Sequence, residues 1–315
     1  MNIVFWFLGV TVGQFEETNI GQALIISKIG INIDRVRFPL ATGFNSFATL
    51  LGGLLTISLT SIRFIPKYKL ISISSSIIFF VMLLLIDSRA AIIYPIIIFI
   101  LTNIIYKKNN IKLIRFSPLI QIGGPILFML FFQFASQIAL FDSISRSSEE
   151  VQTGNSRSLI WAISISKFQD FNIYSLLGHG EYGHYASGAS IAWGSFFGRF
   201  ENSDLMHPHN TILMILFDYG LLGIIIYLYL LNCSIKMIIK SWKYDKKFNI
   251  LIISYLLYFL IIGITESFFG FYYLNTYYLF FSVLIIQAVA YPYLSSEKNK
   301  VRVAPHLYTL STLET

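Results

Sequence analysis

The sequence predicts an all-α integral membrane protein: a polytopic bundle of seven or eight spanning helices with one long polar loop. Two observations on composition and pattern lead to this class. Hydrophobic residues make up 55% of the chain and charged residues only 12%, whereas a soluble domain carries about 25% charged residues. Long apolar runs recur, and Lys and Arg gather between them on alternate connections. No compact soluble core could bury so many apolar runs.

Seven apolar runs are long enough to cross a bilayer, whose core of about 30 Å requires about 20 helical residues. They are residues 45–62, 70–86, 90–106, 116–140, 211–233, 250–265 and 268–289. Residues 1–13 are expected to be either a first short span or the remnant of a longer one, since they lack the features of a signal peptide. Residues 20–31 are expected to lie in the membrane interface. We treat residues 1–315 as one membrane domain.

The basic residues orient the predicted helices. Residues 63–69 hold three, residues 107–115 four, residues 236–247 five and residues 298–302 three, which together are 15 of the 23 in the chain. These connections alternate along the chain, and the positive-inside rule places them in the cytoplasm. The net charge of +7 is therefore mainly an orientation signal. The basic residues form no stripe with interleaved aromatics, so we expect no nucleic acid as a partner.

Residues 141–208 form a loop of nearly 70 residues on the outer side, between two predicted spans. Loops of this length are commonly functional. This one contains Trp161, Trp193 and several glycines, and four of the five histidines lie in it or directly after it. The lone cysteine, Cys233, allows neither an internal disulfide nor a cysteine-based metal site. We therefore look for the chemistry on the outer face.

Three arginines are candidate anion ligands, and each has a simpler interpretation. Arg89 follows one span and begins the next, so it is either an interfacial anchor or a clamp for a phosphate near the membrane surface. Arg157 lies four residues before Trp161, on the same helix face. It is either a surface residue stacked on that ring or a second phosphate contact. Arg37, just before a span, is either a third contact or a simple interfacial charge.

His209 and Asn210 begin a long apolar helix where it meets water, in the segment HNTILMILFDYGLLG at 209–223. His209 has three interpretations. It is a helix cap without chemistry, a metal ligand together with Asp204 and His207, or a catalytic or substrate-positioning residue. We favour the third, because imidazole titrates near neutral pH and can accept a proton from a sugar hydroxyl.

The segment LLGHGEYGHYASG at 176–188 contributes weaker candidates. Gly178 and Gly180 permit tight turns and a close approach of the backbone to a ligand. Without a strand and helix frame, however, such a loop is only weak evidence for a phosphate cradle. Asp218, inside a predicted span, is either part of a proton relay or an interhelical hydrogen-bonding group, and the second is commoner.

Four segments follow one another in the order known from one protein family. They are RFPLATGFNSFA at 37–48, SRAA at 88–91, RSLIW followed by LLGHGEYG, and the motif of His-Asn, nine residues and Gly-x-x-Gly. Together they resemble the bacterial O-antigen ligase/polymerase family of integral membrane glycosyltransferases. The last motif matches without a gap and is the most specific. The resemblance covers residues 37–223. Members of that family usually have several more N-terminal helices, so we expect a shortened member or a fragment.

The resemblance implies glycosyl transfer at the periplasmic face of the bacterial inner membrane. The donor is then a glycan on undecaprenyl diphosphate. The acceptor is a sugar hydroxyl on a second lipid-linked repeat for a polymerase, or on lipid A-core for a ligase. We expect a polymerase first, a ligase second and a lipid-glycan flippase or other transporter third. Polar residues gather at one membrane face instead of lining several spans, which favours surface chemistry over transport. Membrane lipids and a chain-length regulator are the further expected partners.

Within this resemblance, Arg89 and Arg157 are assigned to the diphosphate and His209 to the acceptor hydroxyl, and these three are the expected catalytic residues. Arginines can neutralise the departing diphosphate, so we expect neither a metal nor another cofactor. A direct displacement predicts an inverting transfer. The expected substrate-binding residues are Arg37, Asn210, Trp161, Gly178 and Gly180.

Overall fold

A computed structural model describes residues 4, 8–9, 22–28, 30–39, 44–135, 156–195 and 203–267 of the chain. Within these residues the regular structure is helical, apart from an isolated antiparallel bridge between Gln22 and Asp34. The predicted all-α class is confirmed for this part. The predicted segment 1–13 lies almost entirely outside the described residues, and the predicted span 268–289 lies wholly outside them.

Four described helices are long and apolar enough to cross a membrane: α3 (Phe44–Phe64), α4 (Lys69–Ile86), α5 (Arg89–Lys108) and α13 (Thr211–Ser241). Their number shows an integral membrane protein. Two further apolar helices are α6 (Pro118–Ala135) and α14 (Lys246–Ile262). The described part of the chain therefore holds four candidate spans, fewer than the seven or eight predicted.

Short elements connect or flank these helices. They are α2 (Leu24–Ser27), η1 (Pro66–Tyr68), η2 (Ile111–Phe116), α9 (Arg157–Ser166), α10 (Ile173–Leu177), α11 (Gly183–Ala186), α12 (Ala189–Gly194) and η4 (Ser203–Leu205). The segment expected at the membrane interface contains α2, which packs on the turn between α4 and α5, where Ile25 N donates to Asp87 Oδ1 at 3.4 Å.

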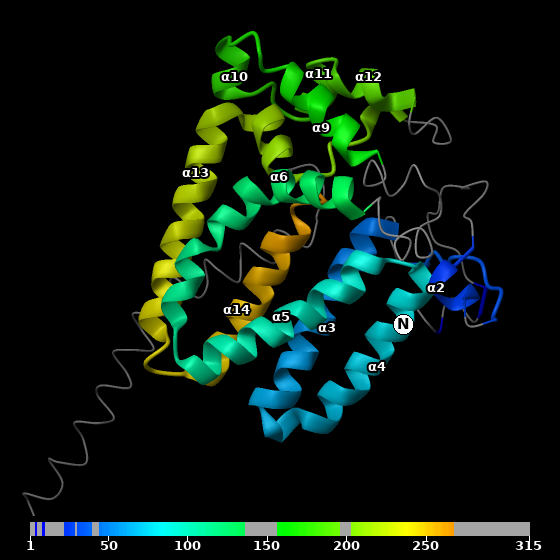
Figure 1. Cartoon of the computed structure of the whole chain (residues 1–315), viewed down its shortest axis with the longest axis vertical. Coiled ribbons are helices and arrows are strands. Elements are labelled where there is room, and N and C mark those ends of the chain that lie inside the picture. The colour runs from blue at the N-terminus through cyan, green and yellow to red at the C-terminus, as the bar shows by residue number, and fades with distance from the viewer. Residues whose placement is uncertain are drawn as a thin grey trace, which may run out of the picture.

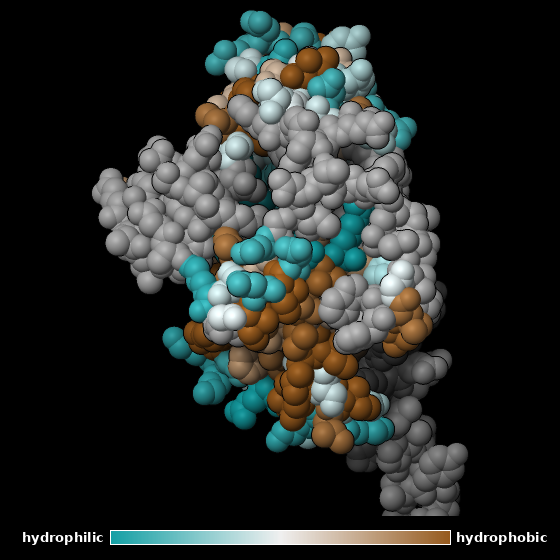
Figure 2. Space-filling model, turned by 90° about the vertical axis from the view of Figure 1, so that its right-hand side faces the viewer, coloured by the Kyte–Doolittle hydropathy of each residue, from teal (hydrophilic) through white to brown (hydrophobic). Residues whose placement is uncertain are grey.

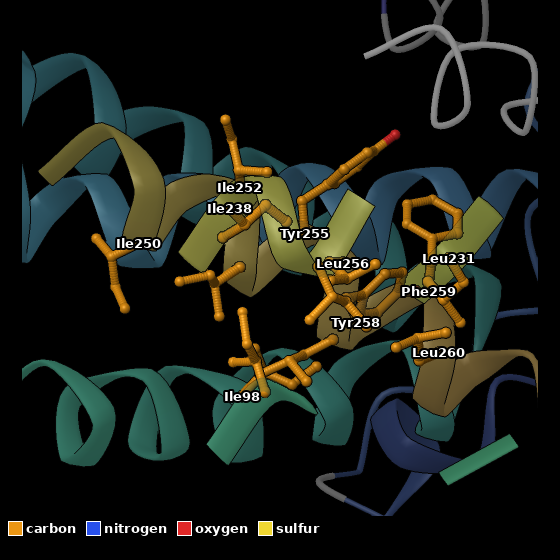
Figure 3. Close-up of a cluster of buried hydrophobic side chains, with 14 of the residues drawn as sticks. Ile98, Leu231, Ile238, Ile250, Ile252, Tyr255, Leu256, Tyr258, Phe259 and Leu260 are labelled. Atoms are coloured by element: carbon orange, nitrogen blue, oxygen red, sulfur yellow. The ribbon is translucent and has the colours of Figure 1, made fainter. Parts of the chain in front are cut away.

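Helix α14 is the centre of the largest buried cluster among the described residues. It packs against α3, α5, α6 and α13, and its side chains interlock with Ile98 of α5 and with Leu231 and Ile238 of α13 (Figure 3). Gly52 of α3 lies so close to α14 that a Cβ there would overlap the Tyr258 side chain. Small residues permit such close helix packing inside membranes.

The outer surfaces of the long helices are apolar. Ile71 and Ile77 of α4, Ile96 of α5 and Ile225 of α13 keep between 48% and 65% of their surface exposed. Figure 2 shows hydrophobic side chains gathered in a brown area on the face that it presents, with hydrophilic side chains above and below it. An exposed apolar surface of this kind fits contact with lipid chains.

Three of the four predicted basic segments are described by the structure and lie at the same end of the bundle, whereas the fourth, residues 298–302, lies outside the described residues. The rings of Phe64 and Tyr106 are 4.5 Å apart between their centroids, and Tyr106 lies 6.1 Å from Trp242. Trp242 Nε1 also donates to Asn109 Oδ1 at 3.0 Å. These contacts join the connections that follow α3, α5 and α13. The prediction that a loop begins at residue 236 is wrong, because α13 continues to Ser241 and carries Lys236 and Lys240 on the helix.

The long loop is folded where the structure describes it. Helices α9 to α12 lie together above the upper ends of α6 and α13 (Figure 1). Ile160, Trp161, Ala189 and Trp193 of the loop pack around Phe217 of α13, and all five side chains are almost fully buried. The loop is therefore anchored on α13, at the end of the bundle away from the basic connections (Figure 1).

Candidate active site

The start of α13 is tied to the turn that follows α14. The Asn210 side chain caps α13 by accepting from Leu213 N at 2.9 Å, and its amide donates to Ile264 O at 2.9 Å. Thr211 N donates to Gly263 O at 2.9 Å, and Thr211 Oγ1 donates to Glu266 O at 3.0 Å. These bonds hold Glu266 next to His209. His209 itself has a left-handed φ of 50°.

Glu266 bridges two of the residues predicted from the sequence. Its Oε2 lies 3.2 Å from His209 Nδ1, and its Oε1 lies 2.9 Å from Arg157 Nη2. Arg157 Nε also donates to Thr265 O at 3.0 Å. The three side chains are 11–16% exposed, so each is mostly buried but keeps some surface that a ligand could contact. We call this group the Arg–Glu–His array.

The array holds charge at neutral pH. Burial alone would raise the pKa of the Glu266 carboxyl, but His209 and then Arg157 outweigh burial and lower this pKa to about 2. Glu266 is therefore ionised. The neighbouring His207 instead favours its neutral form, because burial and the nearby His209 lower its pKa well below the usual value. The two rings lie 4.2 Å apart, and His209 N donates to His207 Nδ1 at 3.2 Å.

Helix α9 brings Arg157 and Trp161 to the start of α13. Trp161 is 1% exposed, and its Nε1 donates to Pro208 O at 3.0 Å. Its ring packs on Phe128 of α6 at a centroid distance of 5.4 Å. The four-residue spacing thus directs both side chains to neighbouring parts of one segment, with Trp161 holding the backbone before His209 and Arg157 holding Glu266.

Helix α5 reaches the same place through Tyr94, which hydrogen-bonds the Thr265 side chain and lies near Arg157 and Glu266. Arg89 begins this helix, five residues before Tyr94. Arg37 lies beside the same end of α5, since its neighbours Val36 and Phe38 pack in one cluster with Ile86 and Ala91. The structure therefore gathers Arg157, His209 and Glu266 in direct contact, and places Arg89 and Arg37 around the α4–α5 turn.

Gly178 and Gly180 lie in the loop after α10, which packs on α13 where that helix breaks. Gly220 has φ 64° and ψ −164°, a conformation that suits only glycine. The break leaves the Phe217 and Asp218 carbonyls to accept from His179 N at 2.8 Å and Gly180 N at 3.0 Å. Figure 1 shows the bend, with α10 beside it.

Residues 74–228 match a protein family described as O-antigen ligase. The chain carries an O-antigen ligase family domain. No curated protein and no solved structure gives a significant match. The family consists of enzymes that transfer lipid-linked glycans, which confirms the resemblance noted from the sequence.

The O-antigen ligase domain contains most of the predicted site. Arg89, Arg157 and His209 lie within residues 74–228 together with Asn210, Trp161, Gly178 and Gly180, whereas Arg37 and Glu266 lie outside. Sequence reasoning missed Glu266, although one signal was present. It is the only charged residue between Lys247 and Glu297, in an otherwise apolar stretch.

The structure also places three potential metal ligands together. Ligand atoms of His207, His209 and Glu266 lie within 4.8 Å of one another. Glu266 thus takes the position that the metal interpretation had given to Asp204, whose carbonyl instead accepts from the Ser190 hydroxyl. Both Glu266 oxygens already have partners, Arg157 at Oε1 and His209 at Oε2, an arrangement that suits an ion pair as well as a metal.

Proposed function

We propose that this protein is an O-antigen polymerase-type glycosyltransferase, which joins undecaprenyl-diphosphate-linked repeats at the periplasmic membrane face. The observation that carries the proposal is the Arg–Glu–His array, in a family of lipid-linked glycan transferases. The array lies at the end of the bundle opposite the basic connections, and the positive-inside rule assigns that opposite end to the periplasm.

In the proposed mechanism His209 receives the proton of the acceptor hydroxyl. Glu266 lies at Nδ1, so the acceptor would be received at Nε2. An ionised carboxylate beside an imidazole fixes the orientation of the ring and stabilises the imidazolium that forms. The low pKa of Glu266, about 2, keeps the carboxylate charged throughout. The acceptor oxygen attacks the anomeric carbon, and the bond from that carbon to the diphosphate breaks with inversion.

Arginines stabilise the departing diphosphate in this proposal. The lipid tail of the donor confines its diphosphate to the depth of the membrane surface, where α5 begins with Arg89. Arg157 approaches from the loop, and Arg37 lies beside the α4–α5 turn as a further contact. Fixed guanidinium groups aimed at developing negative charge lower the barrier without reorganising during the reaction. Holding both lipid-linked substrates in one place removes much of the entropic barrier.

The remaining predicted residues are proposed to position the substrates through the backbone. Asn210 holds the start of α13 against Ile264, and Trp161 holds Pro208, so both set the place of His209. Gly178 and Gly180 shape the loop that covers the break in α13, and from there they would border the bound glycan.

A ligase that transfers the finished glycan to lipid A-core is the second candidate. The observation in its favour is the description of the matched family as O-antigen ligase. The two activities share donor chemistry and differ in the acceptor, so the array serves either of them.

A complementation experiment tests the proposal. The gene is deleted in its source strain and restored as wild type, His209→Ala or Glu266→Gln, and the lipopolysaccharide is compared on a gel. A polymerase predicts that both variants keep a single-repeat band and lose the ladder. Loss of all O-chain assigns the ligase instead. An unchanged ladder with His209→Ala excludes the proposed role of the array. Immunoblots of the membrane fraction verify equal amounts of each protein.

A transfer assay with the purified protein tests whether a metal is required. The proposed chemistry needs none, so transfer is expected to proceed unchanged in excess EDTA. Loss of activity that Zn²⁺ or Mn²⁺ restores would instead assign His207, His209 and Glu266 as its ligands.

A further inference from the structure

A pocket of about 360 Å³ opens at the basic end of the bundle, away from the Arg–Glu–His array. Three helices contribute a cation to it. Arg63 comes from the last turn of α3, Lys107 from the last turn of α5, and Lys247 from the first turn of α14. Its lining includes no acidic residue.

The charge of this pocket favours an anion. Three cations around one small space repel one another, and a bound anion relieves that repulsion. Arg63 and Lys107 are well placed by the dipoles of their own helices, which favour cations at the C-terminus. Lys247 is not, because it lies in the first turn of α14, where a cation is disfavoured. The nearest acid in sequence, Asp245, is used as the cap of α14 and accepts from Phe248 N at 3.0 Å.

The walls of the pocket point to an amphiphilic ligand. Phe64 and Tyr106 line one side with their rings 4.5 Å apart. Asn103 lines it from one turn before Lys107. On α5, Ile100 is 54% exposed and Ile104 is 41% exposed. Because residues three and four apart share a helix face, Ile104 lies beside Asn103 on the face of Lys107, and Ile100 continues that face toward the middle of the membrane.

We propose that this pocket binds the phosphate headgroup of an anionic phospholipid from the inner leaflet. The three cations hold the phosphate, and an acyl chain follows Ile104 and Ile100 along α5. Basic pockets between helices on the cytoplasmic side are a recurrent way to hold such headgroups. A bound headgroup would contact the ends of α3, α5 and α14 at once, and the proposal does not depend on the proposed function.

Two triple variants of the full chain test the site. The pocket variant carries Arg63→Gln, Lys107→Gln and Lys247→Gln. The control variant carries Lys69→Gln, Lys112→Gln and Lys243→Gln, which removes one exposed cation from each of the same three connections. Both variants therefore lose the same charge at the same end. The purified proteins are delipidated, and phosphatidylglycerol or phosphatidylcholine is added back and counted by native mass spectrometry.

Wild type and the control variant are expected to bind phosphatidylglycerol in preference to phosphatidylcholine. The pocket variant is expected to bind phosphatidylglycerol about a hundredfold more weakly, and each single substitution in it about fivefold more weakly. Equal weakening in both triple variants, or weakening in neither, overturns the proposal. The single variants keep the test open where the triple variant fails to fold.

A further arm distinguishes the two sources of phosphate. Inorganic phosphate at the same concentration is expected to displace little lipid, because it cannot contact Ile100 and Ile104. Ile104→Ser is expected to weaken phosphatidylglycerol binding and to leave phosphate binding unchanged. If inorganic phosphate competes as well as the lipid does, the pocket takes a soluble anion and the lipid assignment fails.

Discussion

Arg157 and Glu266 form an ion pair with 2.9 Å between Nη2 and Oε1, although 109 residues separate them in the sequence. The pair joins the long outer loop to the turn after α14, and the same carboxylate holds His209. Each member therefore serves both the local structure and the proposed chemistry, and the two contributions can be separated experimentally.

Glu266→Gln is expected to lower the free energy of unfolding by roughly 2 kcal/mol, because it leaves the Arg157 guanidinium without its charge partner. This figure lies below that for fully buried pairs because the two side chains keep 16% and 11% of their exposure. The double variant Arg157→Gln/Glu266→Gln is expected to recover much of the stability and none of the activity. Thermal unfolding in detergent and the glycan ladder measure the two effects. Additive losses of stability would show that the pair is not coupled.

The stability of the array is expected to fall in acid. The pKa of Glu266 is about 2 in the folded protein and 4.5 ordinarily. The unfolded chain therefore binds the proton first, and the contribution of Glu266 is complete above pH 4.5 and lost as the pH falls toward 2. The melting temperatures of wild type and Glu266→Gln should accordingly converge across this window. A difference that stays constant from pH 6 to pH 2 would contradict the assignment.

Gly220→Ala is expected to destabilise the protein by about 3 kcal/mol or more, because it forces a side chain into a glycine conformation. The added Cβ would also overlap the Leu176 backbone. Gly123→Ala in α6 is the matched control, since a Cβ there meets nothing within 4 Å. The control should be neutral or slightly stabilising. Similar melting temperatures for the two variants would mean that the break in α13 is not required.

Cysteine labelling tests the orientation of the bundle. In a Cys233→Ser background, Phe171→Cys places a thiol before α10, and Phe116→Cys places one at the basic end. The two phenylalanines are similarly exposed, at 66% and 64%. A membrane-impermeant maleimide added to spheroplasts should label position 171 and should label position 116 only after lysis. The reverse pattern would place the array in the cytoplasm.

The sequence predicted the regular helices closely. The bounds of α3, α4 and α5 agree with the predicted spans to within two residues, because an apolar run ended by basic residues or by a tight turn leaves few alternatives. The C-terminal end of α13 was missed. Lys236 and Lys240 can lie on a helix with their stems along it and their charges in water, and hydropathy alone does not detect such a helical continuation.

The site was predicted only in part, for a physical reason. Spacing along one helix identified the shared direction of Arg157 and Trp161. Glu266 lies 57 residues after His209, and only the packing of α14 against α13 brings the two together. The break at Gly220 was also missed, because glycine is common within membrane helices and need not interrupt them.

The nine residues between Asn210 and Gly220 set an angle as well as a distance. Each residue of an α-helix turns the chain by about 100°. The first part of α13, from Thr211 to the break at Gly220, is held near its C-terminal end by the loop bonded to Phe217 and Asp218. One residue inserted between them would rotate the His209 ring to another side of the helix, away from Glu266. The length of the motif thus determines the rotation of His209 about the helix axis, and with it the direction in which the ring faces Glu266.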